Sequence, residues 1–194
     1  MIKGDYLSTI LISTKSVFTL KDIAILWHES NYDIIKNRIN YYVSSGDLYK
    51  IRRGYYAKTK AYRKLELAGR IFTPSYISFE TILAREGLIF QYQSAITAAA
   101  YLTRSLNIEH QSYVYKKIKN PVLIDPAGMR YEDETALAGK ERAFLDTLYL
   151  NAEYHFDNLR SIDWDRVFEI LPVYQNMRLS KTVEAIFRQF KATG

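Results

Sequence analysis

Apolar residues recur at helical spacing in the first part of the chain. From Ile2 to Ser13 they lie three and four residues apart, which predicts a first helix with one buried face. A second helix is predicted to begin after Thr19 and to end near Glu29. Thr19 is a favourable N-cap residue, and the acid Asp22 lies in the first turn, where negative charge stabilises a helix.

A third helix is predicted from the N-cap Asn31 to about Ser44, with Gly46 ending it in the left-handed conformation. Its inward stripe is Ile35, Ile39, Tyr42 and Val43. Its outward side carries Asp33, Lys36, Asn37, Asn40 and Tyr41. We expect no large aliphatic residue on that outward side.

A hairpin is predicted directly after the third helix. The segments 48–51 and 55–57 alternate like short strands around the turn Arg52-Arg53-Gly54. Three helices followed by a hairpin is the order of a winged helix-turn-helix. We therefore predict such a domain over residues 1–60.

The pattern of residues 61–73 predicts a linker helix. A domain boundary is predicted at Pro74, followed by a mixed α/β domain over residues 74–194. Ser78 is the expected cap of a helix through Glu86 that ends at Gly87. Extended segments are predicted at 95–102, 108–117 and 121–125, and helices at 139–150, 167–171 and 179–190. The predicted fold class is α+β.

Composition narrows the possible chemistry. The 194 residues are 48% hydrophobic and include no cysteine, which excludes disulfides, zinc ribbons, thiol nucleophiles and iron–sulfur clusters. The apolar run 95–102 is far shorter than the roughly 20 residues that span a bilayer. We expect no signal peptide, no membrane anchor and a cytoplasmic location.

Positive charge is concentrated toward the N-terminus. The formal net charge is +6, and residues 1–60, 61–119 and 120–194 carry +5, +4 and −3. Excess Lys and Arg favour partners rich in phosphate. The predicted partner of the first domain is double-stranded DNA, and the acidic last third suggests a second face with a different partner.

The residue types that contact DNA lie where a winged helix needs them. Asparagine pairs with adenine edges, lysine reaches guanine or phosphate, and tyrosine donates to phosphate or packs on a thymine methyl. An arginine pair beside a turn glycine binds phosphate or enters the minor groove. The predicted DNA-binding residues are Tyr32, Lys36, Asn37, Asn40, Tyr41, Lys50, Arg52 and Arg53.

Other interpretations of these residues stay open at this point. The polar residues of the third helix also fit a solvated surface, and winged helices also serve as protein-interaction modules. No glycine motif for phosphate binding and no metal-ligating histidine spacing is present, so we expect no catalytic residue, metal or cofactor. A magnesium-dependent nuclease using the acids at 132–134, 163 and 165 is a third hypothesis.

Three blocks of sequence resemble a known family. They are residues 45–56 (SGDLYKIRRGYY), residues 74–80 (PSYISFE) with Gly87-Leu88-Ile89, and residues 138–149 (AGKERAFLDTLY). In this order they resemble the AbiEi antitoxins of type IV toxin-antitoxin (abortive infection) systems of bacteria. The resemblance covers about residues 15–165. One departure is Gly139-Lys140, where relatives often have Thr-Pro.

The resemblance implies a transcriptional autorepressor. Its winged helix would bind inverted repeats in its own promoter, and its C-terminal domain would counter a nucleotidyltransferase-like toxin, with direct toxin binding left open. Glu141 and Asp146 match acidic positions of the family, and we interpret Glu141 as helix-capping and Asp146 as structural. The alternative is a stand-alone regulator whose C-terminal domain binds a ligand or its own kind.

Overall fold

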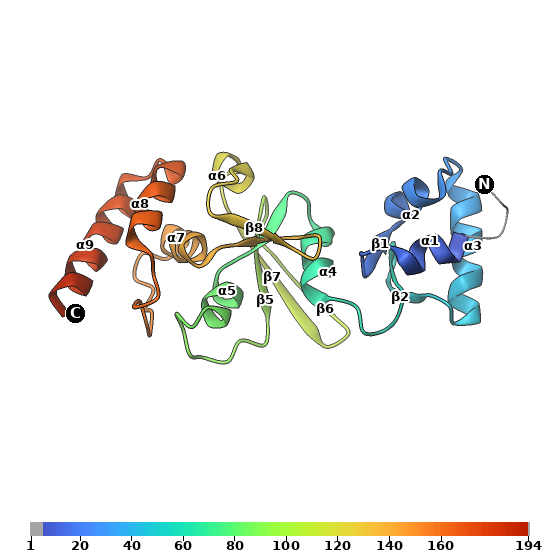
Figure 1. Ribbon diagram of the computed structural model, residues 1–194, viewed down its shortest axis with the longest axis horizontal. Coiled ribbons are helices and arrows are strands. Elements are labelled where there is room, and N and C mark those ends of the chain that lie inside the picture. The colour runs from blue at the N-terminus through green and yellow to red at the C-terminus, as the bar shows by residue number, and fades with distance from the viewer. Residues whose placement is uncertain (1–5, 194) are drawn as a thin grey trace. The chain divides into compact units, whose positions relative to one another are not determined.

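The computed structural model describes residues 6–193 and divides into two compact units, residues 1–67 and 68–194 (Figure 1). The division falls within helix α4 (Lys64–Ile71). Both units combine helices with a β-sheet, so the predicted α+β class is confirmed.

The described part of the first unit, residues 6–67, contains three helices, the start of α4 and a small antiparallel sheet. Its elements before α4 are α1 (Tyr6–Ile12), β1 (Val17–Thr19), α2 (Leu20–Trp27), α3 (Tyr32–Ser45), β2 (Tyr49–Arg52) and β3 (Tyr55–Ala57). The strand order is β1-β3-β2. The hairpin β2–β3 follows α3 as predicted. Strand β1 was not predicted, and it makes the hairpin part of a three-stranded sheet. The predicted residues 2–5 of the first helix lie outside the described residues.

Local polar contacts set the ends of α2 and α3. Thr19 and Asp22 form a capping box, in which the Asp22 amide donates to Thr19 Oγ1 at 3.2 Å and the Thr19 amide donates to Asp22 Oδ2 at 2.9 Å. The amide of Asp33 donates to Asn31 Oδ1 at 3.0 Å at the start of α3. Gly46, with φ of 84°, ends α3. These predicted caps are confirmed, although α2 ends at Trp27, two residues before the predicted end.

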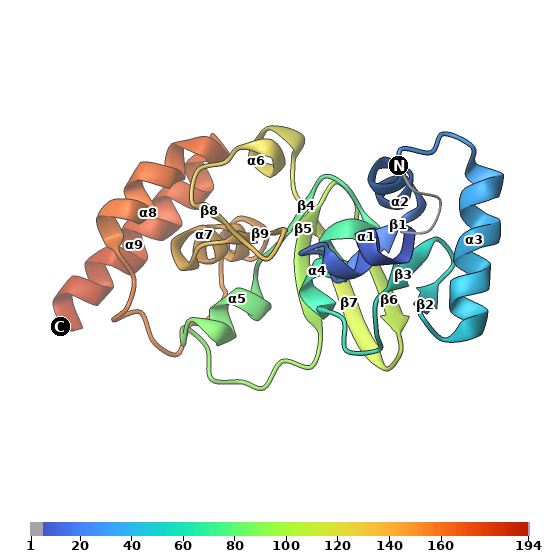
Figure 2. The ribbon, with the colours of Figure 1, turned by 45° about the vertical axis from the view of Figure 1, so that its right-hand side comes forward.

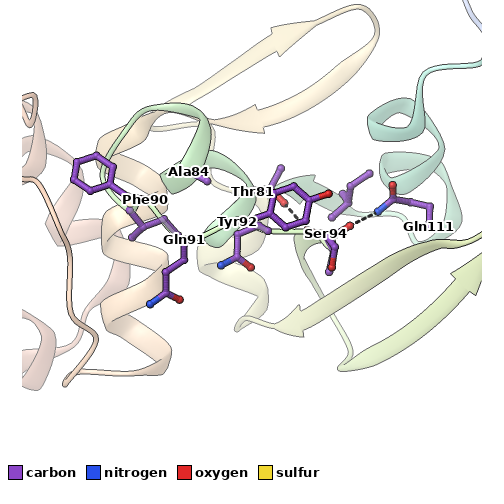
Figure 3. A pocket seen from close by; sticks show the side chains of 11 residues that line it. Thr81, Ala84, Phe90, Gln91, Tyr92, Ser94 and Gln111 are labelled. Atoms are coloured by element: carbon purple, nitrogen blue, oxygen red, sulfur yellow. Dashed lines mark hydrogen bonds between the residues drawn. The ribbon is translucent and has the colours of Figure 1, made fainter.

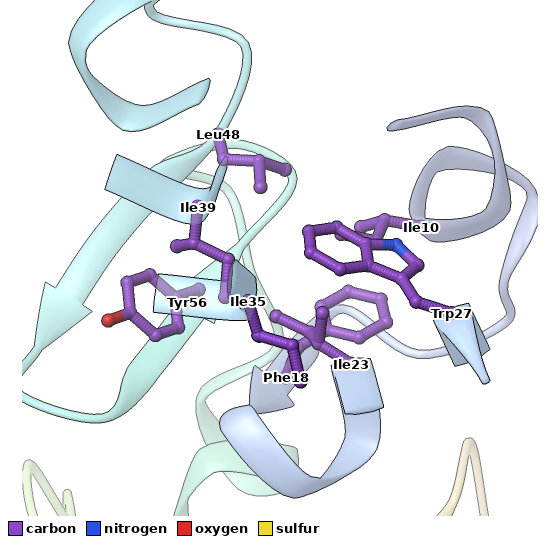
Figure 4. Close-up of a cluster of buried hydrophobic side chains, with 8 residues drawn as sticks. All are labelled: Ile10, Phe18, Ile23, Trp27, Ile35, Ile39, Leu48 and Tyr56. Atoms are coloured by element: carbon purple, nitrogen blue, oxygen red, sulfur yellow. The ribbon is translucent and has the colours of Figure 1, made fainter. Parts of the chain in front are cut away.

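A hydrophobic core fixes the orientation of α3 within the first unit (Figure 4). Ile35 and Ile39 are fully buried, and Tyr42 and Val43 pack against the same core. The core residues are Ile10, Phe18, Ile23, Trp27, Ile35, Ile39, Leu48 and Tyr56. Because this stripe of α3 is buried, its opposite side faces outward.

The second unit is built on a six-stranded mixed sheet of order β6-β7-β5-β4-β9-β8. The pairs β4–β9 and β5–β7 are parallel and the others are antiparallel. The strands are β4 (Ser75–Ile77), β5 (Ile96–Ala100), β6 (Arg104–Ile108), β7 (Gln111–Lys117), β8 (Met129–Glu132) and β9 (Thr135–Ala138).

The helices of this unit are α5 (Glu80–Arg85), α6 (Asn120–Ile124), α7 (Lys140–Leu150), α8 (Trp164–Ile170) and α9 (Met177–Thr193), with the 3-10 helix η1 (Leu171–Tyr174) after α8. Helices α8 and α9 lie side by side (Figure 2), joined by rings such as Phe168 and Phe187, whose centroids are 5.2 Å apart. Within residues 6–193, no helix has the length and apolar character needed to cross a membrane.

Two sequence predictions for this unit are wrong. Residues 120–124 form helix α6, not a strand, because Pro121 occupies the first helical turn, where a missing N–H costs nothing. Ser78 does not cap a helix. It is buried and its hydroxyl donates to Asp146 at 2.7 Å, while α5 begins after Phe79.

Candidate nucleic-acid interface

All eight residues predicted to contact DNA are exposed, and they lie in two places in the first unit. The outer face of α3 carries Lys36, Asn37, Asn40 and Tyr41, and Tyr32 is exposed at the first residue of the helix. The β2–β3 hairpin carries Lys50, Arg52 and Arg53. The apolar residues of the same elements are buried, so the polar set is what these elements present to a partner.

Helical geometry places Asn37 near the centre of the exposed face of α3. Successive residues rotate by about 100°, which puts Lys36 and Asn40 on one flank and Ile34 and Tyr41 on the other. Tyr41 is 67% exposed and Ile34 is 44% exposed. The expectation that this side lacks large aliphatics is therefore wrong. Ile34 was missed because it borders the apolar stripe, where sequence periodicity gives no sharp edge.

A shallow hollow of about 500 Å³ lies on the apolar flank of this face. It is lined by Ile34, Asn37, Arg38, Tyr41 and Tyr42. Ile34 and the tyrosine rings give it apolar walls, and Asn37 and Arg38 supply polar atoms. Such a surface suits a ligand edge that combines a methyl group with hydrogen-bonding atoms.

The two cations of α3 are engaged differently. The guanidinium carbon of Arg38 lies 3.7 Å from the ring centroid of Tyr6 on α1, a cation–π contact. Lys36 Nζ lies 3.3 Å from Asp33 Oδ1 in an exposed ion pair, which contributes little to stability. Arg38 is therefore held toward α1, whereas Lys36 is free to exchange Asp33 for a phosphate.

The charged side chains of β2 are exposed because successive side chains of a strand point to opposite faces. Ile51 is buried, and its neighbours Lys50 and Arg52 are exposed. The guanidinium of Arg52 lies 5.9 Å from the Tyr55 ring centroid. Gly54 follows Arg53 with φ of 84°, a conformation that L side chains rarely adopt, and so permits the tight turn that projects the arginine pair.

Known proteins give no family for this arrangement: no protein-family model and no curated protein matches the chain. The function is therefore inferred from the geometry and charge of the residues themselves.

Two of the acids suggested for a nuclease have other partners. Glu132 forms an ion pair with Arg85 at 2.8 Å, and Asp163 caps α8 by accepting the Arg166 amide at 3.1 Å. Within the described part of the chain, no three His, Asp or Glu side chains are grouped so as to hold a metal ion. The site thus offers no support for the nuclease hypothesis.

A buried ionic cluster occupies the interior of the second unit. Asp146 and Arg142 are fully buried, and the Arg142 Nε donates to Asp146 Oδ1 at 3.4 Å. Asp146 also accepts hydroxyls from Tyr76 at 3.1 Å, Ser78 at 2.7 Å and Tyr174 at 2.6 Å. Solvent does not reach this cluster, which supports the interpretation of Asp146 as structural.

Burial also shifts pKa values within this cluster. It raises the pKa of the Asp146 carboxyl, against smaller opposing effects of Arg142 and the three hydroxyls. Burial, together with the nearby Asp146, raises the pKa of Tyr76 and Tyr174 well above the ordinary value, so both phenols remain donors. Glu141, predicted to cap its own helix, instead accepts the Asp163 amide at 3.2 Å.

An uncharged cavity of about 580 Å³ is present in the second unit (Figure 3). Its rim includes two strongly exposed rings, Phe90 at 73% and Tyr92 at 92%. Amides and hydroxyls from Thr81, Gln91, Gln93, Ser94 and Gln111 line it with apolar side chains, and no acid or base is among the lining residues. The cavity therefore suits a neutral ligand.

Proposed function

We propose that the first unit is a winged helix-turn-helix that binds double-stranded DNA. The observation that carries the proposal is the outward display of all eight predicted contact residues on α3 and the β2–β3 hairpin. In this arrangement α3 enters the major groove, which is about 12 Å wide, and the hairpin lies on the phosphate backbone or the minor groove.

We further propose that the chain is an antitoxin and autorepressor. This step rests on the resemblance of its three sequence blocks to AbiEi antitoxins. The second unit would counter a nucleotidyltransferase-like toxin, directly or indirectly. Coexpression with the adjacent gene tests it: the full chain is expected to restore growth, and a neighbouring gene that is harmless when expressed alone would contradict the proposal.

The arginine pair of the hairpin gives the sharpest test of DNA binding. Replacing Arg52 and Arg53 together by alanine is expected to weaken binding to every sequence, because phosphate contacts carry no base information. The slope of log affinity against log salt should fall by about 2, since two phosphate contacts are lost. Fluorescence anisotropy titrations over a range of salt concentrations measure both quantities.

A matched control removes the same charge elsewhere. Arg178 and Lys181 are exposed on α9 of the second unit, and their double alanine variant should leave the salt slope nearly unchanged. An equal loss in both double variants would mean that net charge, rather than the hairpin, drives the binding. Binding of the unaltered chain that does not depend on salt would contradict the proposal altogether.

A second candidate function is a stand-alone regulator that responds to a small molecule. The uncharged cavity under Phe90 and Tyr92 favours it. A neutral metabolite that binds this cavity and changes the affinity of the chain for DNA would support this function. The absence of a toxin gene beside this one would also favour it over the antitoxin.

A further inference from the structure

We propose that the exposed face of α3 recognises A·T base pairs, with Asn37 pairing with adenine and the flank of Ile34 and Tyr41 receiving the thymine methyl. This inference rests on the proposed DNA binding and specifies its sequence preference.

The position of the arginine in α3 disfavours guanine. Bidentate contacts from arginine or lysine to O6 and N7 are the commonest specific contacts with guanine. The sequence of α3 contains one arginine, Arg38, and its guanidinium lies over the Tyr6 ring at 3.7 Å. Reaching a guanine would break this contact. The arginine of α3 is therefore held away from a guanine, and its lysine, Lys36, is paired with Asp33 at 3.3 Å and lies about 100° around the helix from Asn37.

The amide at the centre of the face matches adenine. Asn37 is exposed and lies in the second turn of α3, and the N-terminal turns of a recognition helix are the ones that meet base edges. An asparagine amide matches the N6 donor and N7 acceptor of adenine, a pairing that no other base offers in the major groove.

Apolar surface lies beside that amide. Ile34 is one turn before Asn37, Tyr41 is one turn after it, and all three line the same hollow of about 500 Å³. Exposed aliphatic surface costs free energy in water, and the thymine methyl is the apolar group that the major groove presents. An adenine contact and a thymine contact are thus available side by side.

Asp33 is an acid on α3 that offers an acceptor to cytosine. Asp33 is 86% exposed at its side chain, and a carboxylate accepts from the N4 amine of cytosine. Lys36 Nζ lies 3.3 Å from this carboxylate. When α3 lies on DNA, both side chains approach phosphates, and these repel the negative charge of Asp33. We therefore expect Asp33→Asn to strengthen binding to all duplexes alike, with no change in base preference.

The experiment begins with a pool of random-sequence duplexes and the full chain. Selected duplexes are expected to be enriched in A·T pairs at the positions protected by the protein. Replacing thymine by uracil at one of these positions removes only the methyl group and should weaken binding about fourfold. This substitution leaves the protein unchanged, so misfolding does not affect the result.

Two protein variants test whether Asn37 makes the adenine contact. Asn37→Ala should reduce the preference for adenine at one position by about tenfold or more while retaining binding to other sequences. Asn107→Ala, the same change at an exposed residue of β6 in the second unit, should change neither affinity nor preference.

Failure of the A·T preference and failure of DNA binding give different results in these experiments. Failure to bind any duplex would overturn the proposed DNA binding. Salt-dependent binding with selection of G·C pairs, or with no effect of uracil, would overturn the A·T inference alone. Loss of a cytosine preference in Asp33→Asn would overturn it as well.

Discussion

Asp146 is a charged residue in a place that solvent does not reach, and its partners determine whether the second unit tolerates it. Three hydroxyls and the guanidinium of Arg142 surround its carboxyl. Arg142 in turn donates to the carbonyl oxygens of Ala127 at 2.6 Å and of Val122. The cluster thereby joins β4, η1 and the segment after β7 to helix α7. Such networks are costly when one member is missing.

Asp146→Ala is therefore expected to destabilise the second unit by about 3–5 kcal/mol, because it leaves Arg142 buried without its anionic partner. Urea unfolding of the full chain measures the loss. Tyr174→Phe, which removes one hydrogen bond to a charged group, should cost about 1.5–3 kcal/mol. Glu153→Ala changes an exposed acid of the same unit and should cost less than about 0.5 kcal/mol. Equal losses in all three variants would contradict the role assigned to the cluster.

At the residue scale, sequence reasoning succeeded where the partner is close in the chain. Two of the groups that donate to Asp146, Tyr76 and Ser78, lie about seventy positions away, so no local pattern could have shown these contacts. Ser78 was assigned a cap because serine prefers that position, but tertiary burial gave its hydroxyl a different acceptor. The exposure of Ile34 depends on where the core of the first unit ends, which the helical period does not specify.

At the scale of elements, the helices of the first unit were predictable because their ends are set locally. The capping box of α2 and the Asn31 cap of α3 each lie within four residues. Strand β1 was missed because its three residues carry no alternation of their own and are defined by pairing with β3, in which Val17 faces Ala57. Helix α6 was assigned to a strand because a short apolar run, residues 121–124, favours both structures.

The capping box gives a prediction at this scale. Thr19→Ala removes the acceptor for the Asp22 amide and should destabilise the first unit by about 1 kcal/mol. In a chain labelled with 5-fluorotryptophan, the ¹⁹F signal of Trp27, at the other end of α2, reports the unfolding of this unit separately from Trp164 in the second unit. Thr14→Ala, at an exposed residue outside the helices, is the matched control and should cost almost nothing. A cost as large in Thr14→Ala would show that the loss does not come from the helix cap.

At the scale of the whole molecule, the two units provide separate reporters. The sequence contains two tryptophans, Trp27 in the first unit and Trp164 in the second. A chain labelled with 5-fluorotryptophan gives one ¹⁹F signal from each unit, so the unfolding of both is followed without a mutation. The charge is also divided, with the basic excess in residues 1–119 and the acidic excess beyond them.

DNA is expected to stabilise the two units unequally. A ligand that binds only the folded state stabilises it by about 2.7 kcal/mol at a hundred times its Kd. Because the proposed contacts all lie in the first unit, duplex DNA should raise the urea midpoint reported by Trp27 and leave that of Trp164 unchanged. The Arg52/Arg53 double alanine variant at the same DNA concentration should lose most of the shift. A shift confined to Trp164 would place the DNA site in the second unit, and equal shifts would show that the units unfold together.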